Sequence, residues 1–229
     1  MRFRVEPMRI EHIPVVAEIE RRSFTQPWPS NAYRKEIQTN RTAHYFVARR
    51  VDDELDQQPS PEPGQTVSDG RAPHAGAEEN GSDHGILGKL SRLFRGPAEG
   101  SPPLEAELLS IAGFAGLWLM TDEAHITTIA VDPIYRGRGI GELLLLGLID
   151  RAKQIGARWL TLEVRMSNRV AQRLYQKYTF KEMGIRRRYY SDNGEDAQVM
   201  WTDPIDSERF REALRQHREV LARKLGHHD

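Results

Sequence analysis

The clearest indication of chemistry in this sequence is a basic, glycine-rich hexapeptide at residues 136–141, RGRGIG. The backbone N–H groups in the first turn of a helix are unpaired and carry a partial positive charge, which attracts anions. Glycines let a ligand approach the backbone closely, and the two arginines add positive charge. If a helix begins here, the hexapeptide would bind a phosphate or a pyrophosphate.

Two common phosphate-binding motifs do not fit this segment. A dinucleotide-binding loop requires G-x-G-x-x-G, but the residue three positions after Gly139 is Glu142. A Walker loop requires Gly-Lys-Ser/Thr, which does not occur here. The segment instead meets the pattern Arg/Gln-x-x-Gly-x-Gly/Ala through Arg136, Gly139 and Gly141. A plain glycine turn between a strand and a helix is the alternative interpretation.

The neighbouring residues predict the strand and the helix that such a loop needs. Residues 125–131 are rich in β-branched side chains and predict a strand, which Asp132-Pro133 would end. Apolar residues then recur at intervals of three and four over residues 140–155, which predicts an amphipathic helix. Gly156 is placed to end that helix as a C-cap. The predicted order is therefore strand, glycine loop and helix.

Composition excludes several kinds of protein and site. The 229 residues include 33 Lys+Arg and 33 Asp+Glu, so bulk charge gives no reason to expect nucleic-acid binding. The chain has no cysteine, which excludes disulfides and a cysteine nucleophile and is compatible with a cytoplasmic location. We expect no membrane span and no signal peptide, because no apolar run is long enough. None of the 8 histidines has a metal-ligand spacing, so we expect no metal.

Further strands and helices are predicted on both sides of the loop. The strands are expected at residues 3–7, 44–51, 106–120, 158–165, 180–190 and 197–202. Helices are expected at residues 11–22, after a Ser30 N-cap, at 168–178 and at 207–225. Asn193-Gly194 predicts the turn of a last hairpin.

Residues 53–105 have a different character from the rest of the chain. They carry 10 acidic and 4 basic side chains and 7 of the 13 prolines, so we expect a disordered insertion. Residues 86–95, ILGKLSRLFR, could form a short basic amphipathic helix that binds a partner, or a fluctuating helix without one. We expect a single domain over residues 1–205, interrupted by this insertion and followed by a charged helical tail at 206–229.

Four separate stretches resemble the ribosomal-protein-alanine acetyltransferases, the RimI type within the GNAT acetyltransferases. They are residues 129–133 with the glycine loop, 162–165 with Ser167-Asn168, Leu174-Tyr175 with Phe180, and 185–190 with 195–197. The resemblance is weak over residues 5–51 and good over 106–205. It implies the GNAT fold, an α/β fold in which helices flank a mixed central sheet. Thr179 departs from the family, which commonly has glycine there.

The resemblance assigns two catalytic residues. N-acetylation requires a base for the ammonium proton and an acid for the departing thiolate. In this family the residue matching Glu163 is the general base, acting through water, and the residue matching Tyr175 is the general acid. From the residues alone, Glu163 is more simply a solvated strand carboxylate paired with Arg165, and Tyr175 a core tyrosine. Alternation along the strand places Thr161, Glu163 and Arg165 on one face.

The resemblance also implies acetyl-coenzyme A (acetyl-CoA) as the acetyl donor. The residues expected to bind its pyrophosphate are Arg136, Gly137, Arg138, Gly139, Ile140, Gly141 and Glu142. Ile129, Ala130 and Val131 would hydrogen-bond its pantetheine arm through the backbone, as an added strand would. Asn168 would hold the donor as well, and it is also placed to cap a helix.

Together these implications indicate an N-acetyltransferase that modifies a protein N-terminal α-amine by direct attack, with the N-terminal alanine of a ribosomal protein as the family's usual acceptor. Two alternatives stay open. One is an acetyltransferase for lysine or small amines, and the other is a catalytically silent acyl-CoA-binding module in which residues 53–105 recruit a partner. The presence of both Glu163 and Tyr175 argues against the silent module.

Overall fold

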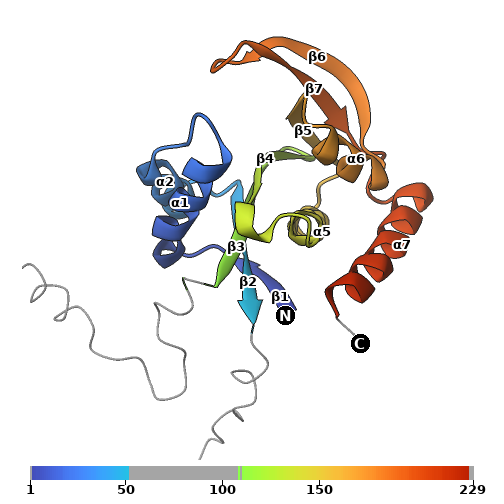
Figure 1. The fold of residues 1–229 in the computed structure, drawn as a ribbon. Helices are drawn as coiled ribbons and strands as arrows, with labels where there is room; N and C mark the ends of the chain where they lie inside the picture. Colours follow the sequence, from blue (N-terminus) through green and yellow to red (C-terminus); the bar gives the residue numbers. More distant parts are fainter. Residues whose placement is uncertain (1, 52–107, 109, 227–229) are drawn as a thin grey trace, which may run out of the picture.

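The computed structural model of the chain describes residues 2–51, 108 and 110–226. In this part of the chain, seven strands form one mixed sheet in the order β1-β2-β3-β4-β5-β7-β6 (Figure 1). The strands are β1 (Arg2–Pro7), β2 (Ala43–Val51), β3 (Ile111–Met120), β4 (Glu123–Val131), β5 (Trp159–Arg165), β6 (Lys181–Tyr190) and β7 (Glu195–Trp201). Only the pairing of β4 with β5 is parallel among these strands. The α/β fold with a mixed central sheet is therefore confirmed.

Helices cover both faces of the sheet (Figure 1). They are α1 (Ile13–Ser23), α2 (Ser30–Thr39), α5 (Ile140–Gln154), α6 (Arg169–Lys177) and α7 (Glu208–Leu225), with short 3-10 turns η1 (Ile10–His12) and η2 (Pro133–Tyr135). On one face α1 and α2 bury Val16, Ile19 and Tyr33 against β2 and β3. On the other face the leucines of α5 pack with β3, β4 and β5 and with α7. The two apolar cores hold the sheet between them.

The parallel strands β4 and β5 pair only over their first residues. Their register begins at Glu123 opposite Trp159 and ends at Ile126 opposite Leu162. Beyond that point β4 continues to Val131 along β3, while β5 continues to Arg165 along β7. The two strands therefore separate, and from residue 127 onward the backbone of β4 has no strand partner on the β5 side among the described strands. The site described below lies at this separation.

Thr179, at the turn into β6, explains why glycine suits this position. Its φ is +62°, in the left-handed region that β-branched residues rarely occupy. The buried Thr179 hydroxyl accepts a hydrogen bond from the Asp203 N–H at 3.2 Å. This bond offsets part of the backbone strain, which typically costs about 1–3 kcal/mol.

The tail helix α7 docks on the face that carries α5. Its buried residues Phe210, Leu214, Leu221 and Leu225 belong to the same core as α5. Arg218 forms a two-point ion pair with Asp150 of α5, with N···O distances of 2.7 and 3.1 Å. The sequence predicted this helix correctly but gave no indication of where it docks.

Several boundaries differ from the sequence predictions, among them those at Ser30, Ile111 and Glu195. Pro29, not Ser30, takes the N-cap position of α2, because Pro29 has the extended conformation that precedes a helix and Ser30 is already helical. The strand expected from residue 106 begins at Ile111, because Ser110 lies in a turn. The last strand begins at Glu195, so the turn before it is shorter than expected. The predictions for residues 53–105 lie outside the described residues.

We expect residues 53–105 to be dispensable for folding. β2 and β3 are antiparallel neighbours, and the Arg50 N–H donates to the Ser110 carbonyl at 2.9 Å, so the two ends of the connection already lie close together. Replacing residues 53–105 by about six Gly and Ser residues should change stability by no more than about 2 kcal/mol, because loop entropy varies slowly with length, by about 0.6 kcal/mol for each doubling. Thermal unfolding and basal turnover measure this. A shortened chain that does not fold would mean that residues 86–95 belong to the core.

Candidate active site

Glu163 lies where β4 and β5 begin to separate. It follows Leu162, the last residue of β5 that pairs with β4. Its side chain is only 7% exposed and contacts two basic groups, Arg186 Nη2 at 3.0 Å and His125 Nε2 at 3.2 Å. A nearly buried carboxylate between two strands can exchange a proton with a group placed in the separation. Glu163 does not pair with Arg165, as the simpler interpretation supposed, because Arg165 pairs with Asp192 and Glu195 instead.

The glycine loop joins the end of β4 to the start of α5. The Asp132 carboxylate accepts from the Ile134 N–H at 3.1 Å and shapes η2, and Gly137 and Gly139 have φ values of +77° and +95°. The first helical bond of α5 runs from the Leu143 N–H to the Gly139 carbonyl, so the N–H groups before Leu143 have no intrahelical acceptor. These groups lie beside the separated end of β4 and can bind an anion.

A buried hydroxyl on β4 also fits a bound group in the separation. Thr128 Oγ1 has no hydrogen-bond partner among the described residues, although it is shielded from solvent. A buried hydroxyl normally finds a partner. Thr128 lies in the part of β4 that has left β5. A polar ligand arm along this segment would supply the missing partner.

The charged side chains of the glycine loop already have partners within the protein, which the sequence did not indicate. Arg136 Nε donates to the Val131 carbonyl at 3.2 Å, and the Arg138 guanidinium lies 5.6 Å from the centre of the Tyr135 ring. Glu142 accepts from Tyr178 Oη at 2.9 Å and pairs with Lys177, and so ties α5 to α6. The Glu142 carboxylate is therefore committed to α6, and only its backbone N–H is available to an anion.

The tail helix α7 meets the glycine loop directly. A Cβ atom on Gly139 would lie 2.9 Å from Leu221 Cδ1. Lys224 Nζ donates to the Gly137 carbonyl at 3.3 Å. Two causes therefore require glycine at position 139, its positive φ and the close approach of α7. A Cβ on Gly141 would meet only Val131 Cγ2, at an ordinary contact distance of 3.6 Å.

Asn168 and Tyr175 lie on α6. Asn168 is the N-cap that the sequence predicted, since its Oδ1 accepts from the Ala171 N–H at 3.1 Å. Tyr175 is partly buried, with its ring centre 5.6 Å from that of Phe180. Burial, with a smaller contribution from Tyr190, raises the pKa of the Tyr175 phenol. The phenol therefore keeps its proton at neutral pH and has a proton to give.

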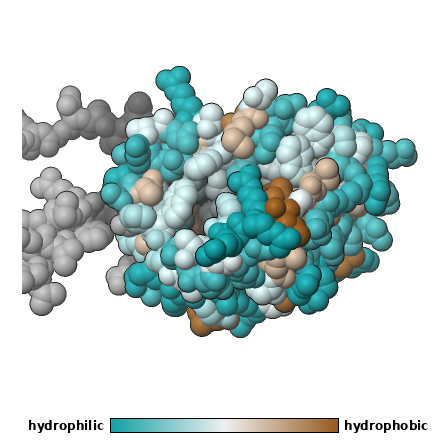
Figure 2. Space-filling model, turned by 90° about the horizontal axis from the view of Figure 1, so that it is seen from above, coloured by the Kyte–Doolittle hydropathy of each residue, from teal (hydrophilic) through white to brown (hydrophobic). Residues whose placement is uncertain are grey.

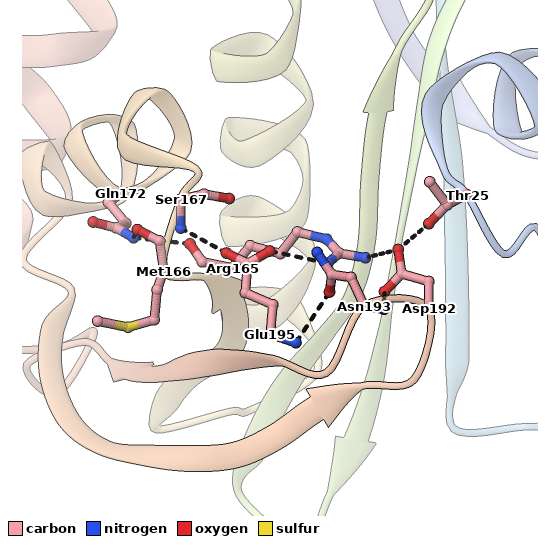
Figure 3. A network of polar contacts seen from close by, with 8 residues as sticks. All are labelled: Thr25, Arg165, Met166, Ser167, Gln172, Asp192, Asn193 and Glu195. Carbon is pink, nitrogen blue, oxygen red and sulfur yellow. Dashed lines mark hydrogen bonds and ion pairs between the residues drawn. The ribbon is translucent and has the colours of Figure 1, made fainter.

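Arg165, at the end of β5, organises the β6–β7 turn (Figure 3). It donates to Asp192 at 2.8 Å and to Glu195 at 3.1 Å, and its guanidinium lies 3.8 Å from the centre of the Tyr190 ring. Hydrogen bonds from Ser167, with Arg165 nearby, lower the pKa of Glu195 to about 2. This network fixes the turn relative to β5.

The same turn is joined to the loop between α1 and α2. Asp192 accepts a hydrogen bond from the Thr25 hydroxyl (Figure 3). The Ser191 hydroxyl donates to Gln26 Oε1 at 2.8 Å. The bridge connects two segments far apart in the sequence. It holds the β6–β7 turn against the loop between α1 and α2.

β6 forms the outer edge of the sheet and exposes apolar and aromatic side chains. Met183, Ile185 and Tyr189 are 65%, 40% and 44% exposed. Figure 2, which views the molecule from above, shows small hydrophobic areas set in a largely hydrophilic surface. Burial and the nearby Glu163 carboxylate raise the pKa of Tyr189. The Arg186 guanidinium, which pairs with Glu163, lies 5.6 Å from the centre of the Tyr189 ring, so Tyr189 can border an approaching acceptor.

Two partners of Glu163 were not predicted from the sequence. His125 lies opposite Thr161 in the β4–β5 register, on the face that carries Glu163. Arg186 reaches Glu163 from β6, which is separated from β5 by β7. Alternation on β4 could have indicated His125 once β4 and β5 were known to be neighbours. Nothing local to Arg186 indicates its contact.

The comparisons agree with this geometry. A sequence model of the Acetyltransferase (GNAT) family matches residues 90–180. A protein of Bacillus subtilis (strain 168), provisionally assigned as a ribosomal protein bS18-alanine N-acetyltransferase, is 34% identical over 86% of this chain and 93% of its own length. The N-alpha-acetyltransferase RimI of Mycobacterium tuberculosis (strain ATCC 25618 / H37Rv) is 32% identical over 83% of this chain and 85% of its own length.

A solved structure is also similar. The ribosomal-protein-S18-alanine N-acetyltransferase from Escherichia coli aligns with a TM-score of 0.57 and 25% identity, covering 90% of this chain and 95% of that protein. Within the described residues, no helix is long and apolar enough to cross a membrane. No cluster of three potential metal ligands occurs among the same residues.

Proposed function

The chain belongs to the GNAT acetyltransferase family and is an N-acetyltransferase, and from that premise we propose that it acetylates a protein N-terminal α-amine with acetyl-CoA as donor. The proposed acceptor is the N-terminal alanine of ribosomal protein bS18, as named for the relatives. Such an acceptor places the reaction in the cytoplasm. The observation that carries the proposal is the nearly buried Glu163 carboxylate where β4 and β5 separate, on a sheet whose strand β4 leads into an anion-binding helix start.

The donor would lie between the separated strands. The unpaired N–H groups at the start of α5 would bind its pyrophosphate, and Gly137, Gly139 and Gly141 leave the backbone accessible. On the side that β5 has left, the backbone of Ile129, Ala130 and Val131 would pair with the pantetheine arm, except at the Val131 carbonyl, which already accepts from Arg136. The side chains of Arg136, Arg138 and Glu142 would act less directly, by holding the loop and α6 in place.

The proposed chemistry uses two titratable groups, Glu163 and Tyr175. An N-terminal ammonium has a pKa near ~8, so a carboxylate acting through water can take its proton at neutral pH. The neutral amine then attacks the acetyl carbonyl, the C–N bond forms and the C–S bond breaks. Tyr175, which keeps its own proton, would donate it to the departing thiolate. The second amine proton replaces the one that Tyr175 gives.

The acceptor would enter near β6 and the bridged turn. Tyr189 is exposed and lies near Glu163, so it can pack on a peptide and still offer a hydrogen bond. The Thr25–Asp192 and Ser191–Gln26 contacts hold the β6–β7 turn in place, and the Glu163 side chain is only 7% exposed, which favours a narrow extended chain. A small first residue such as alanine fits an enclosed approach to Glu163.

Acceptor choice is tested by kcat/KM for peptides that differ only in their first residue. Peptides that begin with Ala, Ser, Met or Asp, followed by the same sequence, separate the alternatives. We expect the Ala peptide to give the highest kcat/KM and the Met and Asp peptides to be at least about tenfold poorer, since an enclosed site discriminates by size and charge. Equal kcat/KM values for all four peptides would contradict the proposed acceptor. No turnover with any of the peptides would favour the catalytically silent acyl-CoA-binding module instead.

A further inference from the structure

We propose that His125 shares the work of the general base, so that the Glu163–His125 pair, not Glu163 alone, takes up the proton of the acceptor ammonium. His125 does not touch the acceptor in this account and acts through Glu163, as a positioning and proton-holding residue. The proposal rests on the proposed function of Glu163. It adds a residue from a different strand to the acetyl-transfer machinery.

A continuous chain of polar atoms leads away from Glu163. Glu163 Oε2 lies 3.2 Å from His125 Nε2, and His125 Nδ1 lies 2.9 Å from Thr161 Oγ1. The Thr161 hydroxyl in turn donates to Glu123 Oε1 at 2.5 Å. Thr161 is 2% exposed, whereas the Glu123 side chain is 24% exposed. The chain therefore runs from the buried carboxylate to a carboxylate that water can reach.

The directions of these hydrogen bonds fix the state of the imidazole. Thr161 gives its only hydroxyl proton to Glu123, so its oxygen can only accept from His125. His125 must therefore carry its proton on Nδ1. In a neutral imidazole this leaves Nε2 as an acceptor, facing the carboxylate oxygen of Glu163, which is also an acceptor. Two acceptors at 3.2 Å repel each other unless one proton lies between them.

The pair thus has a place for one proton that Glu163 alone would lack. The other charged and titratable groups around Glu163 are Arg186, on its second oxygen at 3.0 Å, and the tyrosines Tyr189 and Tyr190. Arg186 can only donate, so the oxygen that it contacts offers no place for a proton. The proton that the pair takes up therefore has its place on the other oxygen, between Glu163 and His125 Nε2. A base that holds its proton near neutral pH is the most effective one for this reaction.

The proton can be followed through one turnover. The acceptor ammonium gives one proton, through water, to the space between Glu163 and His125, and the neutral amine attacks. After attack, the second amine proton replaces the one that Tyr175 has given to the thiolate. The proton held by the pair then leaves to solvent, which reaches the imidazole because the His125 side chain is 20% exposed, while Nδ1 keeps its own proton on Thr161. One proton is released for each acetyl group transferred, as the overall reaction requires.

The pH dependence of His125→Gln tests the proposal. Glutamine can still hydrogen-bond Glu163 but cannot carry the proton. We expect kcat/KM for the Ala peptide to fall about 100-fold at pH ~6.5 and less than about fivefold at pH ~9, where the acceptor amine is already neutral. KM for acetyl-CoA should not change. The matched control is His44→Gln on β2, which removes a half-buried histidine that lies beside Arg151.

A purely structural role for His125 would lower kcat/KM by the same factor at every pH, and that result would overturn the proposal. Thr161 gives a second comparison, because Thr161→Ser keeps the oxygen and Thr161→Val removes it. We expect the serine variant to keep the wild-type pH profile and the valine variant to shift toward that of His125→Gln. Identical profiles for all the variants and the wild type would also overturn the proposal.

A measurement without turnover separates this inference from the proposed function. In ¹⁵N NMR of the full-length protein labelled on histidine, we expect the His125 Nδ1 signal to be that of a protonated nitrogen across the neutral range. Glu163→Gln should change the pH at which Nε2 takes up a proton. A His125 proton on Nε2 alone would overturn the inference even if acetylation is observed. If acetylation is not observed, the NMR result still decides whether the pair holds a proton.

Discussion

Glu163→Gln is expected to lower kcat for acetyl transfer by about 100- to 10,000-fold, the usual contribution of a proton-transfer group. The amide keeps the size of the side chain and can still accept from Arg186, but it cannot take a proton from the amine. The Kd for acetyl-CoA should change by less than about threefold, because Glu163 lies away from the glycine loop. Single-turnover kinetics and calorimetric titration measure the two quantities separately.

Tyr175→Phe should have an effect of the same kind, since it removes the proton offered to the thiolate. The matched control is Tyr45→Phe, which removes a hydroxyl from a buried tyrosine packed with α1 and α2 on the other face of the sheet. Only the Tyr175 variant should lose turnover. If Glu163→Gln and Tyr175→Phe both lose less than about threefold, the two catalytic roles are misassigned.

Gly141→Val is expected to weaken acetyl-CoA binding by about 100-fold or more, because two or three hydrogen bonds to a charged pyrophosphate would be lost. The free protein has room for the added side chain, since a Cβ at this position meets only Val131, at 3.6 Å. The variant should therefore stay folded. Calorimetry with acetyl-CoA and thermal unfolding without it measure the two effects.

A truncated donor supplies the control for this variant. Acetyl-pantetheine has the reactive thioester but not the pyrophosphate, so its turnover should be nearly the same in wild type and Gly141→Val. Equal loss with both donors would mean that the valine disturbs the fold and not the phosphate site. Gly139→Val is a poorer test, because its side chain would meet Leu221 of α7 and its φ is positive.

Much of the site could be predicted because its elements are local. The strand, the loop and α5 follow one another within a short stretch, and turn chemistry with apolar spacing defines each of them. Alternation also placed Glu163 on one face of β5, with Leu162 and Val164 in the core on the other. Asn168 was found as a cap for the same reason, because a cap bonds to its own helix.

The partners of Glu163 could not be predicted, because they depend on the order of the strands. His125 meets Glu163 since β4 and β5 are parallel neighbours, and Arg186 reaches it from across β7. No periodicity within a strand specifies which strand lies beside it. Arg165 shows the consequence, because sequence proximity suggested a pair with Glu163 while the fold gave it Asp192 and Glu195.

The docking of the tail helix α7 could not be predicted for a related reason. Its apolar residues predicted an amphipathic helix, but its contact with the glycine loop joins residues about 85 positions apart. The contact also adds a second reason for glycine at position 139, which the sequence pattern connected only with phosphate binding. Close packing against α7 gives this glycine a structural reason of its own.

The central claim is that the acetyl group goes to an N-terminal α-amine. It is tested most directly with one peptide that begins with alanine and contains an internal lysine, followed by tandem mass spectrometry to locate the acetyl group. We expect the label on the alanine nitrogen, because an α-ammonium loses its proton at much lower pH than a lysine side chain does. Label found mainly on the lysine would contradict the account.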